Sequence, residues 1–201
     1  MLCSTVRGIL VSTEEKYGPE DAIRYKVSKN EVASKTYTQL KKDSESFSCA
    51  LRDLGEQGSH IAVIGMTSYE WLVTYFGTVD SGSVVVPLDV NLPAEDVCDL
   101  IVRSDSTVLV YDEARKDVAA LAGERCPQLR VIVSMQQEEH GERAYAFWKL
   151  LGEHKGSFDY MPGPDQLCTI MFTSGTTGKS KGVMLTHRNG AENATCLDMK
   201  I

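Results

Sequence analysis

Short apolar runs along the chain alternate with segments whose apolar residues recur every three or four positions. The runs at 60–65, 84–88, 107–111, 129–133 and 167–172 predict buried strands. Helical spacing predicts helices at 67–80, 93–101, 113–123 and 145–152. Strands that alternate with helices indicate right-handed crossovers. We therefore expect an α/β fold with a mostly parallel sheet flanked by helices on both faces.

Local signals place the ends of several elements. Two short stretches, 23–26 and 35–37, predict a hairpin around the polar residues 28–34. The next helix is expected to begin at an N-cap, Thr38, and to stop at Gly55. A capping-box pattern from Thr67 to Glu70 opens the following helix, which Ser81 and Gly82 end. Pro87 suggests that the strand at 84–88 ends at an edge or a turn.

The remaining segments are polar or follow the last apolar run. Residues 136–142 predict a surface loop, and residues 156–164, rich in Gly and Pro, predict a connector. The stretch 182–186 reads as a strand, and a helix is expected from His187 to Ile201. The aromatic residues Trp71, Tyr75 and Phe76 fall at helical spacing, so we expect them to belong to the core.

Composition excludes some classes of partner. The chain has 201 residues, 42% of them hydrophobic and 24% charged, which is typical of a globular protein. Its net charge of −7 argues against non-specific binding to nucleic acid or to anionic membranes. The sequence shows no signal peptide, and no apolar run is long enough for a transmembrane segment. Six cysteines without CxxC spacing predict reduced, mostly buried thiols in a cytoplasmic protein.

The segment from Thr173 to Gly182 carries the strongest chemical signal. It holds three glycines and two lysines, and its other residues all carry hydroxyls. Glycines let a ligand approach the backbone, successive N–H groups bind anions, and hydroxyls and lysines bind phosphate oxygens. No acidic residue occurs from Gln166 to Ala191, whereas Lys179, Lys181 and Arg188 are basic. The segment is therefore a candidate polyphosphate-binding loop.

Two other interpretations of this segment remain open. One is a polar, glycine-rich surface loop with incidental lysines. The other is a Walker A loop, G-x-x-x-x-G-K-[ST], whose end matches Gly178, Lys179 and Ser180. The first glycine of that motif falls on Thr173, however, and a Walker A loop opens a helix. A strand is expected after Gly182, so the segment predicts a strand–loop–strand turn.

At these residues the chain resembles the adenylate-forming superfamily, which includes acyl-CoA synthetases, peptide-synthetase adenylation domains and luciferases. The family signature is T-S-G-T-T-G-x-P-K-G-V, and residues 173–183 match it except that Ser180 replaces proline, which puts the stiffness of the loop in question. Three further stretches, 36–55, 66–71 and 80–93, are similar to the family. The resemblance covers about residues 15–200, and bacterial long-chain fatty acyl-CoA ligases are the nearest in character.

The resemblance implies a two-step reaction. A carboxylate attacks the α-phosphorus of ATP to give acyl-AMP and pyrophosphate, and a thiol, usually that of coenzyme A, then displaces AMP. ATP, Mg²⁺, a carboxylic acid and coenzyme A are thus the implied ligands. The implied phosphate-binding residues are Thr173, Ser174, Gly175, Thr176, Thr177, Gly178, Lys179 and Lys181. Lys181 would act in catalysis by neutralising the leaving pyrophosphate, and Thr173 would lie near the Mg²⁺.

Members of this family are considerably longer than this chain. We therefore expect residues 1–201 to be a partial N-terminal domain of an AMP-forming ligase, inactive alone, with its phosphate-binding loop at 173–182. The segments that bind adenine and ribose, and the C-terminal domain, would be absent. A truncated chain, a degradation product or an incomplete gene would explain this length. The alternatives are an adenylation domain of a peptide synthetase and a nucleotide-binding module that performs no chemistry.

Overall fold

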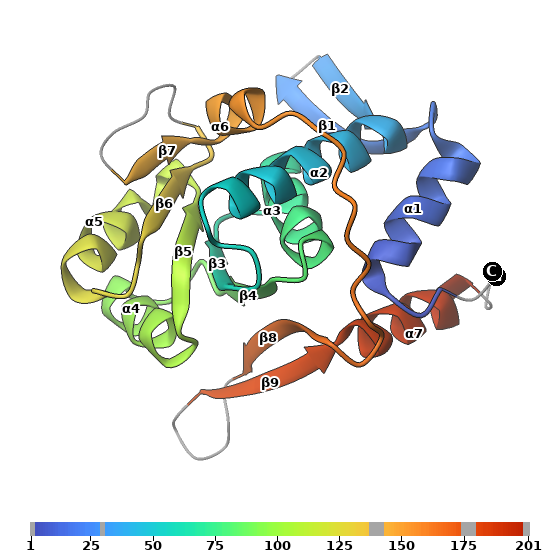
Figure 1. Ribbon diagram of the computed structural model, residues 1–201. Coiled ribbons are helices and arrows are strands. Elements are labelled where there is room, and N and C mark those ends of the chain that lie inside the picture. The colour runs from blue at the N-terminus through green and yellow to red at the C-terminus, as the bar shows by residue number, and fades with distance from the viewer. Residues whose placement is uncertain (1–2, 29–30, 137–142, 174–179, 199–201) are drawn as a thin grey trace.

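The structure, a computed structural model, describes residues 3–28, 31–136, 143–173 and 180–198. A seven-stranded sheet has the order β7-β6-β5-β3-β4-β8-β9. Its parallel strands are β3 (His60–Ile64), β4 (Val84–Leu88), β5 (Ser106–Tyr111), β6 (Val131–Ser134), β7 (Ala144–Ala146) and β8 (Leu167–Thr173). The last strand, β9 (Lys181–Thr186), is antiparallel to β8. The mostly parallel α/β sheet expected from the sequence is confirmed (Figure 1).

Helices cover both faces of this sheet. One face packs against α1 (Val6–Tyr17), α2 (Tyr37–Asp53), α3 (Tyr69–Asp80) and α6 (Phe147–Glu153), and the other against α4 (Ala94–Arg103) and α5 (Lys116–Arg125). Side chains alternate between the faces, so Ile61 joins the first core cluster and Ala62 the second. Because both faces are buried, the strands read in the sequence as continuous apolar runs. A 3₁₀ turn, Glu113–Arg115, precedes α5, and α7 (His187–Asp198) follows β9.

The helix ends show where the sequence signals were misplaced. The N-cap of α2 is Thr36, not Thr38: its hydroxyl accepts the N–H of Gln39, whose side chain accepts the N–H of Thr36. Ser68, not Thr67, caps α3 by accepting the N–H of Trp71. In each case a neighbouring hydroxyl residue has the extended backbone that an N-cap needs.

Most other expected elements are confirmed. The hairpin forms a separate two-stranded sheet of β1 (Asp21–Ser28) and β2 (Glu31–Thr36). The expected loop at 28–34 is too long, because Ser28 pairs with Glu31 and residues 31–34 belong to β2. Gly55 and Gly82 follow their helices with φ of 74° and 76°. Pro87 is the last residue but one of β4, which lies between β3 and β8 and is followed by a turn at Asp89, so the turn expected at Pro87 is confirmed and the sheet edge is not. Of the predicted polar loop, residues 137–142 lie outside the described part of the chain.

Two elements were not expected: the helix α1 and the short strand β7. Thr5 caps α1 by accepting the N–H of Gly8, and Arg7 on this helix is buried. Arg7 donates to the carbonyl oxygen of Phe158 at 2.5 Å. The connector that contains Phe158 has no helix or strand and runs past α2 and α1 to β8 (Figure 1). The first helix thus fixes the segment that brings β8 beside β4.

The cysteines agree with the expectation from the sequence where they are described. Four cysteines are free and buried, namely Cys49, Cys98, Cys126 and Cys168, and Cys3 is free and half-buried.

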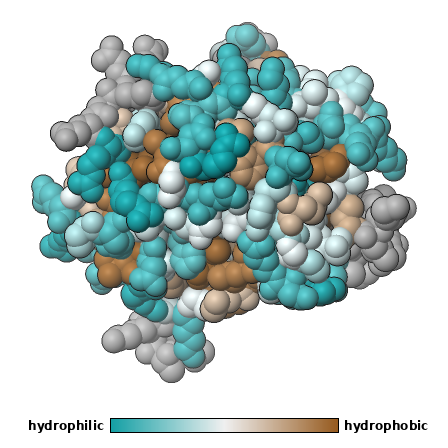
Figure 2. All heavy atoms as spheres, viewed as in Figure 1, coloured by the Kyte–Doolittle hydropathy of each residue, from teal (hydrophilic) through white to brown (hydrophobic). Residues whose placement is uncertain are grey.

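Within residues 3–28, 31–136, 143–173 and 180–198, no group of three or more His, Cys, Asp or Glu side chains could hold a metal ion. No helix in those ranges is long and apolar enough to cross a membrane. Hydrophilic side chains dominate the face seen in Figure 2, with apolar patches between them.

A buried carboxylate joins the amino ends of β5 and β6. Glu56 accepts hydrogen bonds from Arg130 Nε at 2.5 Å, from Arg130 Nη2 at 2.8 Å and from Thr107 Oγ1 at 2.6 Å. Burial alone would raise the pKa of Glu56, but the hydrogen bonds from Arg130 and Thr107 lower it below its ordinary value. The folded state therefore favours the ionised carboxylate.

Replacing Arg130 with methionine is expected to reduce the free energy of unfolding by about 1–2 kcal/mol at pH 7. The loss stays moderate because the Arg130 side chain is 58% exposed. A lowered pKa stabilises the fold above the ordinary value of 4.5, and this contribution disappears as the pH falls through the folded-state pKa. Urea denaturation at pH 7 and pH 3.5 should show the deficit shrinking in acid. Arg24→Met, which breaks an exposed pair with Asp21, is the control; an equal deficit at both pH values would contradict the assignment.

Candidate functional site

The candidate loop lies between β8 and β9. Thr173, the last residue of β8, pairs directly with Lys181, the first residue of β9. The predicted strand–loop–strand arrangement is thus confirmed, and the Walker A interpretation is wrong because a strand, not a helix, follows the loop. Among the predicted site residues the structure places Thr173 and Lys181. The others lie outside the described residues: Ser174, Gly175, Thr176, Thr177, Gly178 and Lys179.

The strand order puts this turn at the carboxyl edge of the parallel sheet. Thr169 of β8 pairs in parallel with Val85 of β4, so Thr173 lies level with the residue that follows β4, Asp89. Ligands of open α/β sheets bind at this edge. The two aspartates at the strand ends are engaged in turns: Asp89 accepts the N–H of Asn91, and Asp112 accepts that of Ala114.

The pairing also determines which way the two side chains face. Directly opposed residues of an antiparallel pair share a face, so Thr173 and Lys181 project together, while Phe172 and Gly182 share the other face. Thr169 is on the same side as Thr173, and its hydroxyl lies 3.2 Å from that of Tyr75 on α3. Thr173 and Lys181 therefore project on the α3 side of the sheet, and both are exposed.

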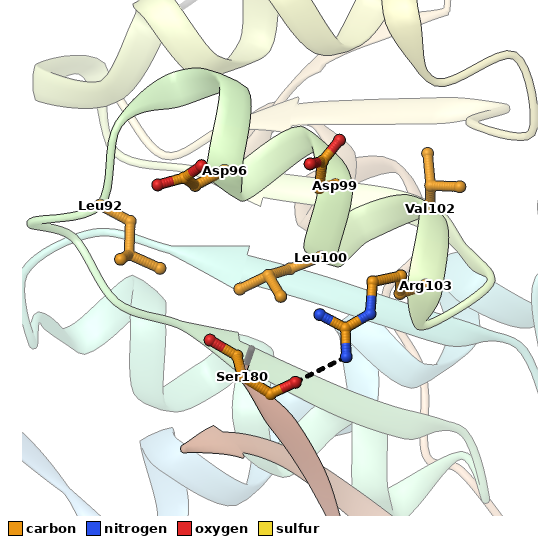
Figure 3. Close-up of a pocket in the computed structure, with 7 residues that line it drawn as sticks. All are labelled: Leu92, Asp96, Asp99, Leu100, Val102, Arg103 and Ser180. Atoms are coloured by element: carbon orange, nitrogen blue, oxygen red, sulfur yellow. Dashed lines mark hydrogen bonds between the residues drawn. The ribbon is translucent and has the colours of Figure 1, made fainter. Parts of the chain in front are cut away.

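The opposite side of the turn faces α4. There Arg103 Nη2 donates a hydrogen bond to the carbonyl oxygen of Ser180 at 2.6 Å, and its guanidinium lies 5.4 Å from the centre of the Phe172 ring. Arg103 and Ser180 border a depression of about 500 Å³ (Figure 3). It is lined by Leu92, Asp96, Asp99, Leu100, Val102, Arg103 and Ser180.

Sequence reasoning did not find Arg103. A basic residue in the last turn of a helix is common, because it complements the helix dipole. Nothing in its neighbourhood points to a partner 77 positions later. Only the insertion of β8 next to β4 brings α4 and the loop together.

Of the basic residues in the acid-free stretch 166–191, Arg188 does not lie beside Lys181. Arg188 forms an ion pair with Asp165, with its Nε and Nη2 at 2.9 and 3.0 Å from the two carboxylate oxygens. It follows β9 at the end away from Thr173. On the α4 side, Asp96 and Asp99 line the depression next to Ser180. Within the part of the turn that the structure describes, Lys181 is therefore the basic residue on the α3 side.

The aromatic residues of α3 pack as the sequence predicts. Trp71, Tyr75 and Phe76 are partly buried against the first core cluster. The rings of Trp71 and Tyr75 stack with centres 5.7 Å apart, and Tyr75 meets Phe76 edge-on. Burial raises the pKa of the Tyr75 hydroxyl, which stays protonated and can donate to Thr169.

Comparison with known proteins identifies the family. The AMP-binding enzyme family matches residues 13–200, and the chain therefore belongs to it. A probable acyl-activating enzyme 16 of Arabidopsis thaliana is 31% identical over 92% of this chain and 28% of its own length. A D-alanine–D-alanyl carrier protein ligase of Streptococcus equi subsp. equi (strain 4047) is 30% identical over 77% of this chain and 27% of its own length.

Solved structures agree with the fold. An anthranilate CoA ligase in complex with anthranoyl-AMP matches with a TM-score of 0.83, at 20% identity, over 94% of this chain and 36% of that protein. A fatty acyl CoA synthetase of Mycobacterium tuberculosis matches with a TM-score of 0.76, at 21% identity, over 92% of this chain and 35% of that protein. The chain thus has the fold of the N-terminal part of acyl-CoA synthetase-like proteins and spans about a third or less of these relatives.

Proposed function

We propose that the polypeptide carrying this chain is an AMP-forming ligase that activates a carboxylic acid with ATP and passes the acyl group to a thiol. The observation that carries this proposal is the strand–loop–strand turn, in which Thr173 and Lys181 project side by side at the carboxyl edge of the sheet. Membership of the AMP-binding enzyme family supports it. In the first step an anion must approach a polyanion, so fixed donors and positive charge are what the protein must supply.

In this proposal residues 173–181 bind the β- and γ-phosphates of ATP, and Lys181 neutralises the leaving pyrophosphate. Thr173 is exposed, and its hydroxyl would offer one oxygen ligand to a Mg²⁺ ion that binds with the nucleotide. The described residues offer no acidic cluster that would hold the metal by itself. Mg²⁺ bound with the nucleotide would add positive charge at the phosphates.

The finer part of the proposal is that the acid is a fatty acid, that the thiol is coenzyme A and that the reaction takes place in the cytoplasm. The match to the M. tuberculosis fatty acyl CoA synthetase supports the first two, and the free cysteines support the third. The relative named as a D-alanyl carrier protein ligase favours a second candidate, in which the acid is an amino acid and the acceptor is a carrier-protein thiol.

We also propose that residues 1–201 form part of a larger N-terminal domain and are inactive alone. The chain matches less than a third of the two curated relatives. Within the described residues β9 is the last strand of the sheet. Three apolar side chains on β8 and β9 are exposed: Met171 by 46%, Val183 by 43% and Met184 by 66%. Their exposure supports the proposal that a further part of the polypeptide packs against these two strands.

An ATP–pyrophosphate exchange screen with the complete polypeptide tests the function. Fatty acids of graded chain length form one arm, and amino acids, including D-alanine, form the other. Exchange with a fatty acid, followed by thioester formation with coenzyme A, is the expected result. Exchange only with an amino acid would favour the second candidate, and absence of exchange with every acid would contradict the ligase assignment.

A further inference from the structure

Arg103 contacts β8 and the residue that immediately precedes β9. Its guanidinium lies over the ring of Phe172, near the end of β8. It also donates to the carbonyl oxygen of Ser180, just before β9 (Figure 3). A guanidinium can do both at once because it is planar, stacks on aromatic faces and donates within its plane. One side chain of α4 thus connects the helix to the two strands where they leave the sheet.

This contact lies on the opposite face from the side chains of Thr173 and Lys181, the two described residues that we propose bind phosphate or Mg²⁺. Phe172 pairs with Gly182, where an added Cβ would lie 3.2 Å from Ile170 Cγ2 and 3.4 Å from the Phe172 ring. The glycine therefore leaves room for the Phe172 ring, over which the Arg103 guanidinium lies. Because Lys181 projects on the α3 side, the contact that links Arg103 to it runs through the backbone.

The backbone group that Arg103 holds is the one next to Lys181. The carbonyl of Ser180 and the N–H of Lys181 belong to the same planar peptide unit. Fixing that carbonyl therefore fixes the direction in which the chain enters Lys181. Ser180 itself leaves φ free, whereas a proline would restrict it. A hydrogen bond from outside the loop supplies a restraint at this position.

We propose that Arg103 is a positioning residue of the phosphate-binding loop: it holds the Ser180–Lys181 peptide so that Lys181 is oriented before the nucleotide binds. The expected effect on ATP affinity rests on the proposed function, whereas the restraint of the Ser180–Lys181 peptide by Arg103 does not depend on it. A group that is already oriented loses less conformational freedom on binding, so the affinity for ATP is higher. Arg103 contacts no part of the substrate in this assignment.

The kinetic test uses Arg103→Met and Arg103→Lys in the complete polypeptide, assayed by ATP–pyrophosphate exchange. Arg103→Met is expected to raise the KM for ATP about three- to tenfold, as for the loss of one charge-assisted hydrogen bond at an exposed site. The KM for the acid and the melting temperature should stay unchanged. Arg103→Lys, which keeps a charged donor, should recover part of the effect. Arg125→Met is the matched control, because Arg125 is an exposed basic residue at the end of the neighbouring helix α5.

A second measurement does not depend on ligase activity. Trypsin cleavage of the Lys181–Gly182 bond, followed by mass spectrometry, should be several-fold faster in Arg103→Met than in the wild type or in Arg125→Met. Unchanged cleavage together with an unchanged KM for ATP would overturn the inference, as would an equal effect of Arg125→Met. If the wild type shows no exchange with any acid, the proposed function fails, and the cleavage rates alone decide whether Arg103 holds the loop.

Discussion

Replacing Lys181 with alanine in the complete polypeptide is expected to lower the rate of ATP–pyrophosphate exchange about 100-fold and to raise the KM for ATP. In the proposed reaction negative charge accumulates on pyrophosphate as its bond to the α-phosphorus breaks. A fixed ammonium group at that point stabilises the transition state more than bound ATP, so the rate constant falls as well as the affinity. Lys181 is suited to this role because it projects beside Thr173, on the face of the turn away from Asp96 and Asp99.

The chain offers a sharp control for this prediction. Arg188 belongs to the same acid-free stretch of sequence as Lys181, but its guanidinium is paired with Asp165. Arg188→Ala should therefore leave exchange nearly unchanged, whereas Lys181→Arg should retain much of it because the charge is kept. Equal losses in Lys181→Ala and Arg188→Ala would show that only the net charge of the region matters. Unchanged exchange in Lys181→Ala would remove this residue from the mechanism.

The parts of the fold that could be predicted from the sequence are those whose causes are local. The strands β3, β4 and β5 are buried on both faces, so each appears as an uninterrupted apolar run. The strand–loop–strand turn could be predicted because glycines and hydroxyls predominate from Thr173 to Gly182 and an apolar run lies on each side. Helix ends were less certain, because adjacent residues such as Thr67 and Ser68 compete for the same cap.

The contacts that could not be predicted depend on the order of strands in the sheet. β8 comes after β7 in the sequence but pairs with β4, at the other side of the sheet. That placement alone brings Arg103 to Ser180. The length of β9 separates Arg188 from Lys181, since this strand spans six residues, roughly 20 Å. Arg188 is therefore close to Lys181 in the sequence but does not lie beside it in space.

The helix α1 illustrates a different limit. It buries Val6 and Leu10, too few residues for a clear apolar stripe, and it also buries a charged side chain, Arg7. Burial of an arginine is favourable only if its partners are already in place. Those partners come from α2, α3 and the connector, so no local pattern announces them.

Replacing Arg7 with methionine is expected to lower the free energy of unfolding by about 3–5 kcal/mol at neutral pH, because the buried Asp80 loses its counter-charge and the carbonyl of Phe158 loses its donor. Arg7 Nη1 contacts Asp80 Oδ2, and its Nη2 lies 3.8 Å from Glu45 Oε1 and donates to the carbonyl of Phe158. Asp80 is only 1% exposed. Glu45 keeps a second partner, since Lys41 lies 2.8 Å from it, so the cost falls mainly on Asp80.

The pH dependence of this loss has a definite sign. Burial raises the pKa of Asp80 to about 6, against the opposing effect of Arg7. A carboxyl whose folded-state pKa is raised favours folding below its ordinary pKa of 3.8, and that contribution is lost as the pH rises through about 6. Without Arg7 the pKa rises further. The deficit of Arg7→Met should therefore be largest above pH 6 and shrink toward pH 5, where Asp80 is protonated.

Urea denaturation of Arg7→Met at pH 7.5 and pH 5, with the exposed Arg24→Met as control, measures both the size and the sign of this effect. The double variant Arg7→Met, Asp80→Leu should recover much of the stability at pH 7.5, because it removes the buried charge together with its partner. A deficit below about 1 kcal/mol would mean that water reaches Asp80 and that the pair resembles a surface ion pair. A deficit that grows toward pH 5 would contradict the assignment of the loss to a buried Asp80 carboxylate, since protonation relieves that cost.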